Sequence, residues 1–480
     1  MSRSFSYSLK RYRWKEFWLF IIPFVILLLE MTQLLLARLI HSGTLNGTSF
    51  LNVHNLPTIQ GLIPVIGLIV ALFAVNIFLS IFFPKADQML LPLTGLLSGI
   101  GVLMALRTGP ALSPPDPTQG TRQLMWVILG LIAFLITMII LKNMRWLKQY
   151  RYILLAIGLL LLLASVVNAF RVKNFNSPTH DQLNFGPFSL QPSEFLKIIL
   201  VIVFAGFLSE RRDFFGNNDV HIGFLRIPVP RVNELGPLAI MLGISLLIFL
   251  GIRELGLALL IYGIFLCMIY LGSGRITYVV GGLLIFAASS FLGYTVLSHF
   301  HIFSYVGERF QTITFNVVDW QHWTAADELF AENAGLQIVQ GLIALSSGGI
   351  LGAGLGLGHP TFVPVVQSDM IFTGLGEELG LAGLFGIIAI YMLILYRGYR
   401  IAVETADPFN QLLAAGLTSI FAIETLIIIA ANMNFFPLTG LPLPFLSYGG
   451  SSLLANYIII GILMRISHDT ALAKEREGSE

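Results

Sequence analysis

The feature that most constrains this sequence is a series of long apolar runs separated by short polar segments. Many of these runs reach the roughly 18 residues that a helix needs to cross a bilayer. Hydrophobic residues make up 56% of the chain and charged residues 11%, whereas a soluble domain has about 45–50% and about 25%. One globular core cannot bury this excess, so the sequence predicts an all-α polytopic membrane protein and not a soluble enzyme.

We expect about twelve transmembrane helices. The expected spans are 17–36, 58–83, 88–106, 124–142, 152–170, 194–209, 236–252, 255–272, 276–297, 369–396, 410–433 and 449–466. The first run lacks a small-residue cleavage site, which is typical of a signal anchor and not of a removed signal peptide. The single cysteine, Cys267, can form no intrachain disulfide, so the redox compartment stays open.

The lysines and arginines support this count and give it an orientation. If the N-terminus is cytoplasmic, most of the 28 basic residues fall on cytoplasmic segments, as the positive-inside rule requires. Both termini are therefore expected inside the cell. The net charge of +2 gives no sign of a nucleic-acid partner.

Three connections on the outer side are long, at residues 171–193, 298–368 and 434–448. The second is the long extracellular loop before the tenth helix. The third, NFFPLTGLPLPFLSY, is apolar but broken by prolines, which stop regular helix. Irregular backbone at membrane depth is tolerated only against protein or a water-filled cavity, so this segment predicts a re-entrant loop.

Asp369 opens the tenth helix, at the head of the run VVQSDMIFTGLGEELG. It could be a helix cap with no other role, because Ser368 or Asp369 can accept hydrogen bonds from the first free amides. It could also be a base, because desolvation raises the pKa of a carboxylate toward neutrality. Glu377 and Glu378 are rotated away from it by about 80° and about 180°. We interpret them mainly as buried structural groups paired with other helices, and a supporting role behind the site stays open.

Other polar residues have a structural and a functional interpretation. Glu194 and Lys197 lie three apart on one helical face and can form a local ion pair; alternatively, Lys197 contacts a pyrophosphate. Arg253 and Glu254 lie between two helices, where a cap is the simpler interpretation. Glu30 is expected to make a contact between helices.

The glycine-rich run at 348–358 lacks the flanking pattern of a nucleotide-binding loop and predicts close packing or a flexible loop. The nine histidines have no HExxH or CxxC companions, so we predict no protein-built zinc site.

Four motifs resemble the SEDS family of cell-wall polymerases, the RodA and FtsW proteins. In chain order they are QPSEFLKI (191–198), LQIVQGLIALSSGGILGAGLGLG (336–358), VPVVQSDMIFTGLGEELG (363–380) and PLTGLPLPFLSYGGSS (437–452). The family core has ten helices. The resemblance therefore implies a core at 88–468, an N-terminal addition at 1–87 with a cytoplasmic tail and two extra helices, and a cytoplasmic tail at 469–480.

The resemblance implies a peptidoglycan glycosyltransferase that polymerises lipid II on the outer face of the plasma membrane. Asp369 matches the family's essential aspartate, which is thought to deprotonate the acceptor hydroxyl in an inverting transfer. It implies a class B penicillin-binding transpeptidase as partner and no dedicated cofactor, with room for a divalent cation. The residues expected to bind substrate are Glu194, Lys197, Arg253, Glu254, Arg309, Gln337, Gln340 and Ser447.

The chain departs from the family pattern at several positions, and other functions stay open. The stretch HDQLNFG (180–186) lacks the family's Arg-Trp, Leu336 replaces a tyrosine, and Glu424 replaces a glutamine. The alternatives to a polymerase are a lipid II flippase and a non-catalytic scaffold of a division or elongation complex.

Overall fold

The computed structural model of the chain describes residues 13–41, 59–171, 183–185, 188–210, 219–222, 225–228, 254–292, 319–333 and 335–477, with isolated positions between 236 and 246 and between 311 and 317. The chain forms two compact units, which are described one at a time. The first unit holds Met1–Lys142, Trp323–Arg397 and Pro442–Glu480, and the second holds Asn143–His322 and Gly398–Leu441.

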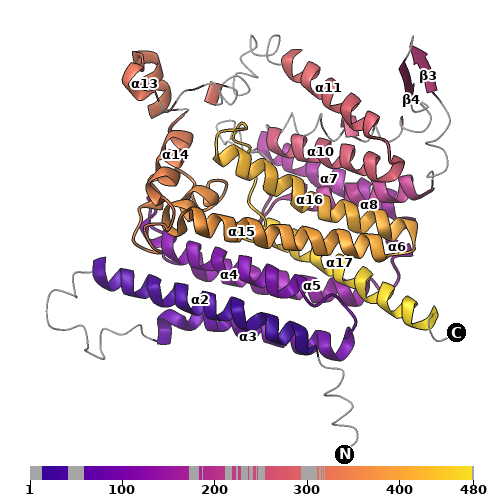
Figure 1. The fold of residues 1–480 in the computed structure, drawn as a ribbon, viewed down its shortest axis with the longest axis horizontal. Helices are drawn as coiled ribbons and strands as arrows, with labels where there is room; N and C mark the ends of the chain where they lie inside the picture. Colours follow the sequence, from indigo (N-terminus) through magenta and orange to yellow (C-terminus); the bar gives the residue numbers. More distant parts are fainter. Residues whose placement is uncertain are drawn as a thin grey trace, which may run out of the picture. The chain divides into compact units, whose positions relative to one another are not determined.

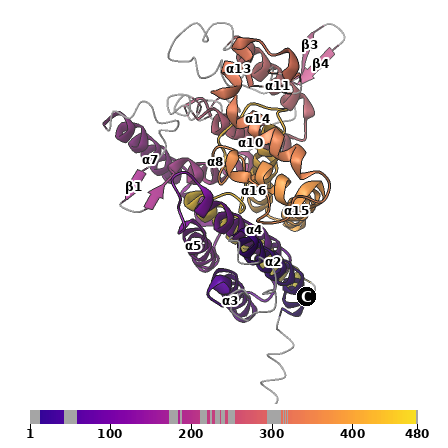
Figure 2. The same cartoon turned by 90° about the vertical axis from the view of Figure 1, so that its left-hand side faces the viewer.

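The first unit is helical in its described part. Its helices are α2 (Trp14–His41), α3 (Ile59–Phe82), α4 (Leu90–Thr108), α5 (Gln119–Ile140), α13 (Ala325–Glu332), α14 (Leu336–Gly348), α15 (Ile371–Glu404) and α17 (Gly450–Glu477), with 3-10 turns at Gly109–Ala111 and Pro360–Phe362. The end of α15, beyond residue 397, belongs to the second unit. Helices α2 and α3 run beside α4 and α5 in both views (Figure 1, Figure 2).

The second unit contains helices and two small hairpins. Its helices are α6 (Arg145–Gln149), α7 (Arg151–Arg171), α8 (Pro192–Glu210), α10 (Leu255–Ser273), α11 (Ile276–Leu292) and α16 (Pro408–Asn432), with a 3-10 turn at Trp320–His322. Strand β1 (Leu183–Phe185) pairs antiparallel with β2 (Phe188–Leu190), with Leu183 opposite Leu190. Strand β3 (Asp219–Ile222) pairs antiparallel with β4 (Leu225–Pro228), with Asp219 opposite Pro228.

The prediction of a helical, multi-pass membrane protein is confirmed. Within the described residues, nine helices are long and apolar enough to cross a membrane, and each overlaps one of the predicted spans. The predicted spans 152–170 and 276–297 correspond to α7 and α11, whose apolar stretches Arg151–Ser165 and Ile276–Ser289 are shorter. The predicted span 236–252 lies outside the described residues apart from isolated positions, so the number twelve stays a prediction.

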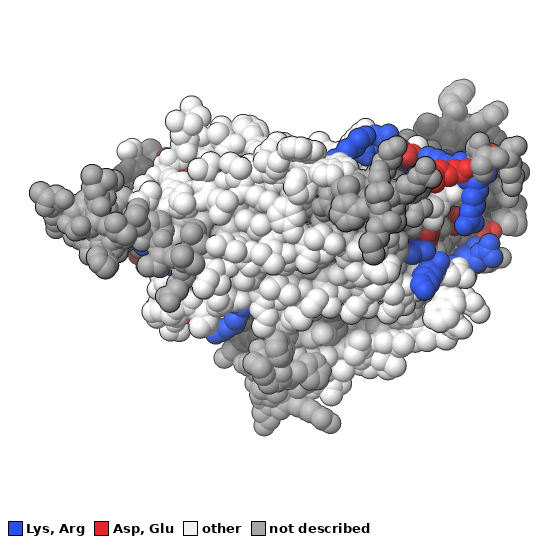
Figure 3. All heavy atoms as spheres, turned by 90° about the horizontal axis from the view of Figure 1, so that it is seen from below, with Lys and Arg blue, Asp and Glu red and all other residues white. Residues whose placement is uncertain are grey.

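Uncharged side chains cover most of the described surface on the face shown in Figure 3. On α2, the exposed side chains include Trp18, Ile22 and Leu29. Such a large exposed apolar surface is unusual for a soluble monomer, and it fits a surrounding of acyl chains.

The described part of the long connection 298–368 contains α13 and α14, which the sequence analysis did not predict. Helix α13 begins with a reciprocal cap: the Asp327 amide donates to Thr324 Oγ1, and the Thr324 amide donates to Asp327 Oδ2. The backbone hydrogen bond from Thr324 also lowers the pKa of Asp327 below its usual value. The spacing Thr-x-x-Asp is a known start signal for a helix, so this element was predictable.

Glycines on α4 allow α2 and α3 to approach it closely. A Cβ atom added at Gly99 would lie 2.5 Å from Leu27 of α2, and one at Gly95 would lie 2.9 Å from Leu72 of α3. Small residues have this role at helix interfaces in membranes, where packing replaces the hydrophobic driving force. The two N-terminal helices are therefore packed against the rest of the first unit.

A buried polar cluster ties the start of α2 to α4 and α15. Arg13 donates to the backbone carbonyl oxygens of Ala86 and Asp87. The Asp87 carboxylate accepts the Leu90 amide at 3.0 Å, which caps α4, and also pairs with Arg397 of α15. Because Asp87 is buried, its charge is compensated mainly by these contacts.

Replacing Asp87 with alanine is expected to destabilise the protein by about 3 to 5 kcal/mol, because Arg397 loses its partner and α4 loses its cap. Asp87→Asn keeps an acceptor for the cap and is expected to lose less. Thermal melting of the detergent-solubilised protein measures both effects. Glu404→Ala, which breaks the exposed pair with Arg400, is the control, with an expected loss under about 1 kcal/mol. Equal melting temperatures for Asp87→Ala and Glu404→Ala would contradict the assigned role of Asp87.

Candidate functional site

Asp369 lies in the turn segment that precedes α15, two residues before the first helical residue. Its side chain is half-buried. The side-chain amide of Gln337, from α14, lies 3.2 Å from each carboxylate oxygen and donates to them. This donor is neutral, so the contact with Gln337 adds no positive charge beside the carboxylate.

Close packing of α14 on the start of α15 brings Gln337 to Asp369. A Cβ atom added at Gly341 would lie 2.4 Å from Met370 and 3.2 Å from Thr373, so only glycine fits there without a shift. Gln340 is three residues from Gln337 and therefore lies on the same face of α14. The structure thus brings together Asp369 and Gln337 of the predicted site. Gln337 lies on α14, in a stretch that the sequence analysis assigned to a loop.

Ser447 joins the proline-rich segment to the segment that carries Asp369. Its hydroxyl donates to the carbonyl oxygen of Ser368 at 2.5 Å and accepts the Leu443 amide at 2.8 Å. One residue further on, the Tyr448 amide donates to the carbonyl oxygen of Gln367 at 2.8 Å. These bonds fix the backbone directly before Asp369. Ser447 is buried, and its hydroxyl is already engaged by backbone groups.

Strained backbone lies on both sides of this junction. Val365 has a φ of 57° and Phe445 a φ of 65°. Side chains other than glycine rarely adopt this left-handed region, and a β-branched residue such as valine is especially unfavourable there. Such strain persists only where the surrounding structure holds it, and it is often found at functional sites.

The part of the proline-broken segment that belongs to the first unit is buried in protein, and its position within the membrane stays a prediction. Leu443, Phe445 and Leu446 are at most 1% exposed. A Cβ atom at Gly101 of α4 would lie 2.5 Å from the carbonyl oxygen of Leu446, so a glycine is needed at this crossing. The Tyr391 hydroxyl of α15 donates to the carbonyl oxygen of Pro444 at 2.5 Å.

Helix α15 is interrupted at Gly380, whose φ of 66° and ψ of −172° are not helical. The glycine-rich segment at 348–358 supplies hydrogen bonds at this break. The amides of Ala353 and Gly354 each donate at 2.9 Å, to the carbonyl oxygens of Glu377 and Glu378, and the Leu381 and Ala382 amides donate back to the segment. A Cβ atom at Gly352 or Gly380 would lie 2.2 Å from backbone atoms across this contact, which confirms the expectation of close packing.

The two acids before the break have partners of their own. Arg107 of α4 donates to Glu378 Oε1 at 2.9 Å and to the carbonyl oxygen of Gly358 at 2.7 Å. Glu377 accepts the backbone amide of His359 at 2.7 Å. The interpretation of Glu378 as a buried group paired with another helix is confirmed; the partner of Glu377 is a loop amide.

In the second unit, Lys197 of α8 is fully buried between two carboxylates. Its Nζ lies 2.8 Å from Glu194 Oε2 and 2.9 Å from Glu424 Oε2 of α16. The expected local pair of Glu194 and Lys197 is confirmed. The lysine therefore has a carboxylate partner on each side, one from its own helix and one from α16.

Of the remaining predicted site residues in the second unit, the structure describes Glu254. Glu254 is buried directly before α10, and a Cβ atom at the neighbouring Gly256 would lie 2.4 Å from the carbonyl oxygen of Thr439. Arg253 and Arg309 lie outside the described residues. Their roles, like those of Glu254, Gln340 and Ser447 toward a substrate, stay predictions.

Sequence reasoning missed two partners of these groups. The sequence analysis assigned no role to Arg107, although a cation at the end of an apolar run is expected to pair with a carboxylate. Glu424 was noted as a departure from a family pattern but not assigned to the site. An acid inside the apolar stretch AIETLIII carries the same signal.

Comparison with known proteins gives a consistent result. The family model FTSW_RODA_SPOVE, described as a cell cycle protein, matches residues 88–472, so α2 and α3 precede the matched range. The peptidoglycan glycosyltransferase RodA of Mycobacterium leprae is 37% identical over 396 residues, which cover 81% of this chain and 79% of that protein. A probable peptidoglycan glycosyltransferase FtsW of Geobacter metallireducens is 30% identical over 392 residues, which cover 80% and 95%.

A solved structure shares the fold. That structure concerns the "structural coordination of polymerization and crosslinking by a peptidoglycan synthase complex". It superimposes with a TM-score of 0.61 at 22% identity and covers 80% of this chain and 98% of its own.

Replacing Lys197 with methionine is expected to cost about 3 to 5 kcal/mol, because Glu194 and Glu424 would face each other buried without a cation. Glu424→Gln removes one carboxylate and keeps the other ion pair, so its loss is expected to be smaller. The double variant Lys197→Met/Glu424→Gln is expected to melt above Lys197→Met alone, which is a coupling that independent sites do not show. Thermal melting measures all three. A double variant that melts below the single lysine variant would refute the charge cluster.

Proposed function

The chain belongs to the FtsW/RodA/SpoVE family of cell cycle proteins and is by this relationship a peptidoglycan glycosyltransferase, and we propose that it polymerises lipid II with Asp369 as the general base. Lipid II is a disaccharide-pentapeptide linked to undecaprenyl pyrophosphate. The product is a glycan strand on the outer face of the plasma membrane. The observation that carries this proposal is the half-buried Asp369 carboxylate, held by Gln337 at 3.2 Å.

The reaction needs a proton acceptor, because a sugar hydroxyl is a weak nucleophile until it loses its proton. In the proposed step, the acceptor O–H proton moves to the Asp369 carboxylate. The freed oxygen forms a bond with the anomeric carbon of the donor sugar, and the bond from that carbon to the pyrophosphate oxygen breaks with inversion. The undecaprenyl pyrophosphate leaves with the electron pair. A positioned general base typically contributes about 10²- to 10⁴-fold in rate.

Gln337 is proposed to orient the base. An amide donor to both oxygens fixes the direction of the carboxylate and brings no charge of its own. The bonds from Ser447 and Tyr448 to the backbone before Asp369 support the same idea, since they hold the segment that carries the base. Ser447 is therefore proposed as a positioning residue.

The pyrophosphate leaving group calls for positive charge. Lys197 is held between two carboxylates, so it is better suited to fix α8 against α16 than to bind an anion by itself. We therefore propose Arg253 and Arg309 as pyrophosphate contacts. A divalent cation bound with the substrate would supply the same charge compensation.

We propose a wider setting for this chain that comprises twelve spans, both termini in the cytoplasm, a family core at 88–468 and an N-terminal addition at 1–87. The family match at residues 88–472 supports the division between core and addition. A class B penicillin-binding transpeptidase is the proposed partner, because the matched structure concerns a complex that couples polymerisation with crosslinking. The alternatives, a lipid II flippase or a scaffold, give no role to a proton acceptor on the Asp369 segment.

Asp369→Asn is expected to abolish glycan synthesis, with a loss of at least about 10²-fold, because asparagine cannot take up the proton. The purified protein, with its transpeptidase partner, is supplied with lipid II in detergent micelles, and the glycan chains are separated on gels. Asp116→Asn, which removes an exposed partner of Arg122, is the matched control and is expected to retain activity. Full activity of Asp369→Asn would refute the base. Movement of labelled lipid II across liposomes without chain formation by the unaltered protein would favour the flippase.

Ser447→Ala is expected to lower kcat about tenfold with little change in KM, because the base is displaced while the substrate contacts remain. The pH dependence of kcat should keep its shape, since the titrating group is unchanged. Ser447→Thr keeps the hydroxyl and is expected to recover part of the rate. A rise in KM with an unchanged kcat would instead make Ser447 a substrate contact.

A further inference from the structure

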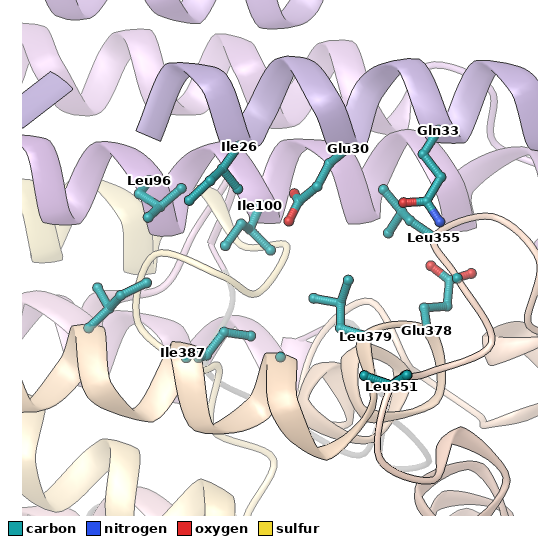
Figure 4. A pocket seen from close by; sticks show the side chains of 14 residues that line it. Ile26, Glu30, Gln33, Leu96, Ile100, Leu351, Leu355, Glu378, Leu379 and Ile387 are labelled. Atoms are coloured by element: carbon teal, nitrogen blue, oxygen red, sulfur yellow. The ribbon is translucent and has the colours of Figure 1, made fainter. Parts of the chain in front are cut away.

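A cavity of about 310 Å³ lies within the first unit, between α2, α4, the glycine-rich segment and α15 (Figure 4). The proposed polymerase reaction does not use it. One wall comes from α2, which precedes the part of the chain that matches the family model. The cavity is open toward the surface, because the lining residues Gln33, Leu351 and Gly386 are exposed. Its volume lies at the lower end of the range of small-molecule sites, about 300 to 1,000 Å³.

Three polar side chains line this cavity. Figure 4 shows Glu30 and Gln33 projecting from α2 toward the cavity, with Glu378 of α15 on the opposite wall. A Cβ atom at Gly354 would lie 2.9 Å from Gln33 Nε2, so the glycine-rich segment closes tightly on α2 here. Polar groups within spanning helices are costly and usually face a functional interior.

The carboxylates leave hydrogen-bonding capacity toward the cavity. Glu378 is fully buried, and its Oε1 accepts from Arg107 at 2.9 Å. The backbone amide of Gly356 also interacts with this carboxylate, but Oε2 accepts no hydrogen bond of normal geometry from the described residues. An unsatisfied buried oxygen costs about 1 to 3 kcal/mol, and more if charged. A donor from a bound molecule would remove this cost.

The rest of the lining is apolar. On α15 it includes Gly386, where no neighbouring atom fills the space that a side chain would occupy. The walls include Ile26, Leu96, Ile100 and Ile387. A Cβ atom added at Gly386 would meet nothing within 4 Å, so this stretch of the wall is open. A site with an apolar body and a few polar groups is typical of ligand pockets, and its apolar part matches a single acyl chain.

We propose that this cavity binds one acyl chain of a membrane lipid, with a hydroxyl or ammonium headgroup that donates hydrogen bonds to Glu30 and Glu378. Two carboxylates on the lining disfavour an anionic headgroup, because like charges repel at low dielectric. A donor headgroup supplies what Glu378 Oε2 lacks, and the apolar walls cover the chain. The bound lipid would rest against the glycine-rich segment that supports the break in α15 at Gly380. This break lies eleven positions after Asp369 along the chain.

The test uses the full-length protein in detergent micelles and a monoacylglycerol that carries a diazirine in its chain. After irradiation and digestion, mass spectrometry is expected to find the label on peptides of α2 around Ile26–Gln33 and of α15 around Leu379–Ile390. Gly386→Leu fills the gap and is expected to reduce this labelling at least fivefold. Gly386→Ala is the matched control and is expected to leave labelling nearly unchanged, since leucine and alanine both favour helix over glycine. Ile26→Phe fills the cavity from the opposite wall and gives a second, independent variant.

The headgroup is tested separately. Glu30→Leu is expected to reduce labelling by the monoacylglycerol more than labelling by the methyl ester of the same chain, which has no donor. Competition by unlabelled monoacylglycerol or by phosphatidylethanolamine identifies a hydroxyl or an ammonium donor, and either result supports the proposal. Labelling that is unchanged in both filled variants, that the methyl ester reproduces in full, or that neither lipid displaces would overturn it.

Discussion

The structure of the first unit depends on one constraint, which is that backbone groups inside a membrane must find partners within the protein. Helix α15 is broken at Gly380, and the break would leave carbonyl oxygens and amides unpaired in a spanning segment. The glycine-rich segment pairs them, and Arg107 joins that segment to Glu378. Asp369 lies between the glycine-rich segment and the break along the chain, so its position depends on these contacts.

The two groups of charged residues differ in the partners that the structure gives them. Lys197 is enclosed by Glu194 and Glu424, which tie α8 to α16. Asp369 accepts hydrogen bonds from the amide of Gln337, which brings no charge of its own. A structural link between buried charged groups needs charge compensation, whereas the proposed base needs a carboxylate that can take up a proton. The contrast explains why acids that resemble one another in the sequence are suited to different roles.

The N-terminal helices contact the rest of the first unit at several positions along α2. Arg13 and Asp87 link the start of α2 to α4 and α15, Gly99 admits Leu27 of α2, and Gln33 lies against the glycine-rich segment. These contacts connect a segment outside the family-matched range to the same segment that supports the break in α15. The cavity between them lies in this contact region, and the proposed lipid would add to the same set of contacts.

The sequence by itself determined the membrane class, most span positions, the pairing of Glu194 with Lys197 and the family motifs, because hydropathy and short-range spacing are local properties. It also marked Asp369 as unusual. Only the tertiary structure decided which distant groups meet: Gln337 with Asp369, Glu424 with Lys197, Arg107 with Glu378, and Ser447 with the backbone of Ser368. It also revealed α14 within a predicted loop. A carboxylate must find a partner at membrane depth, but which one it finds depends on how helices far apart in the sequence pack together.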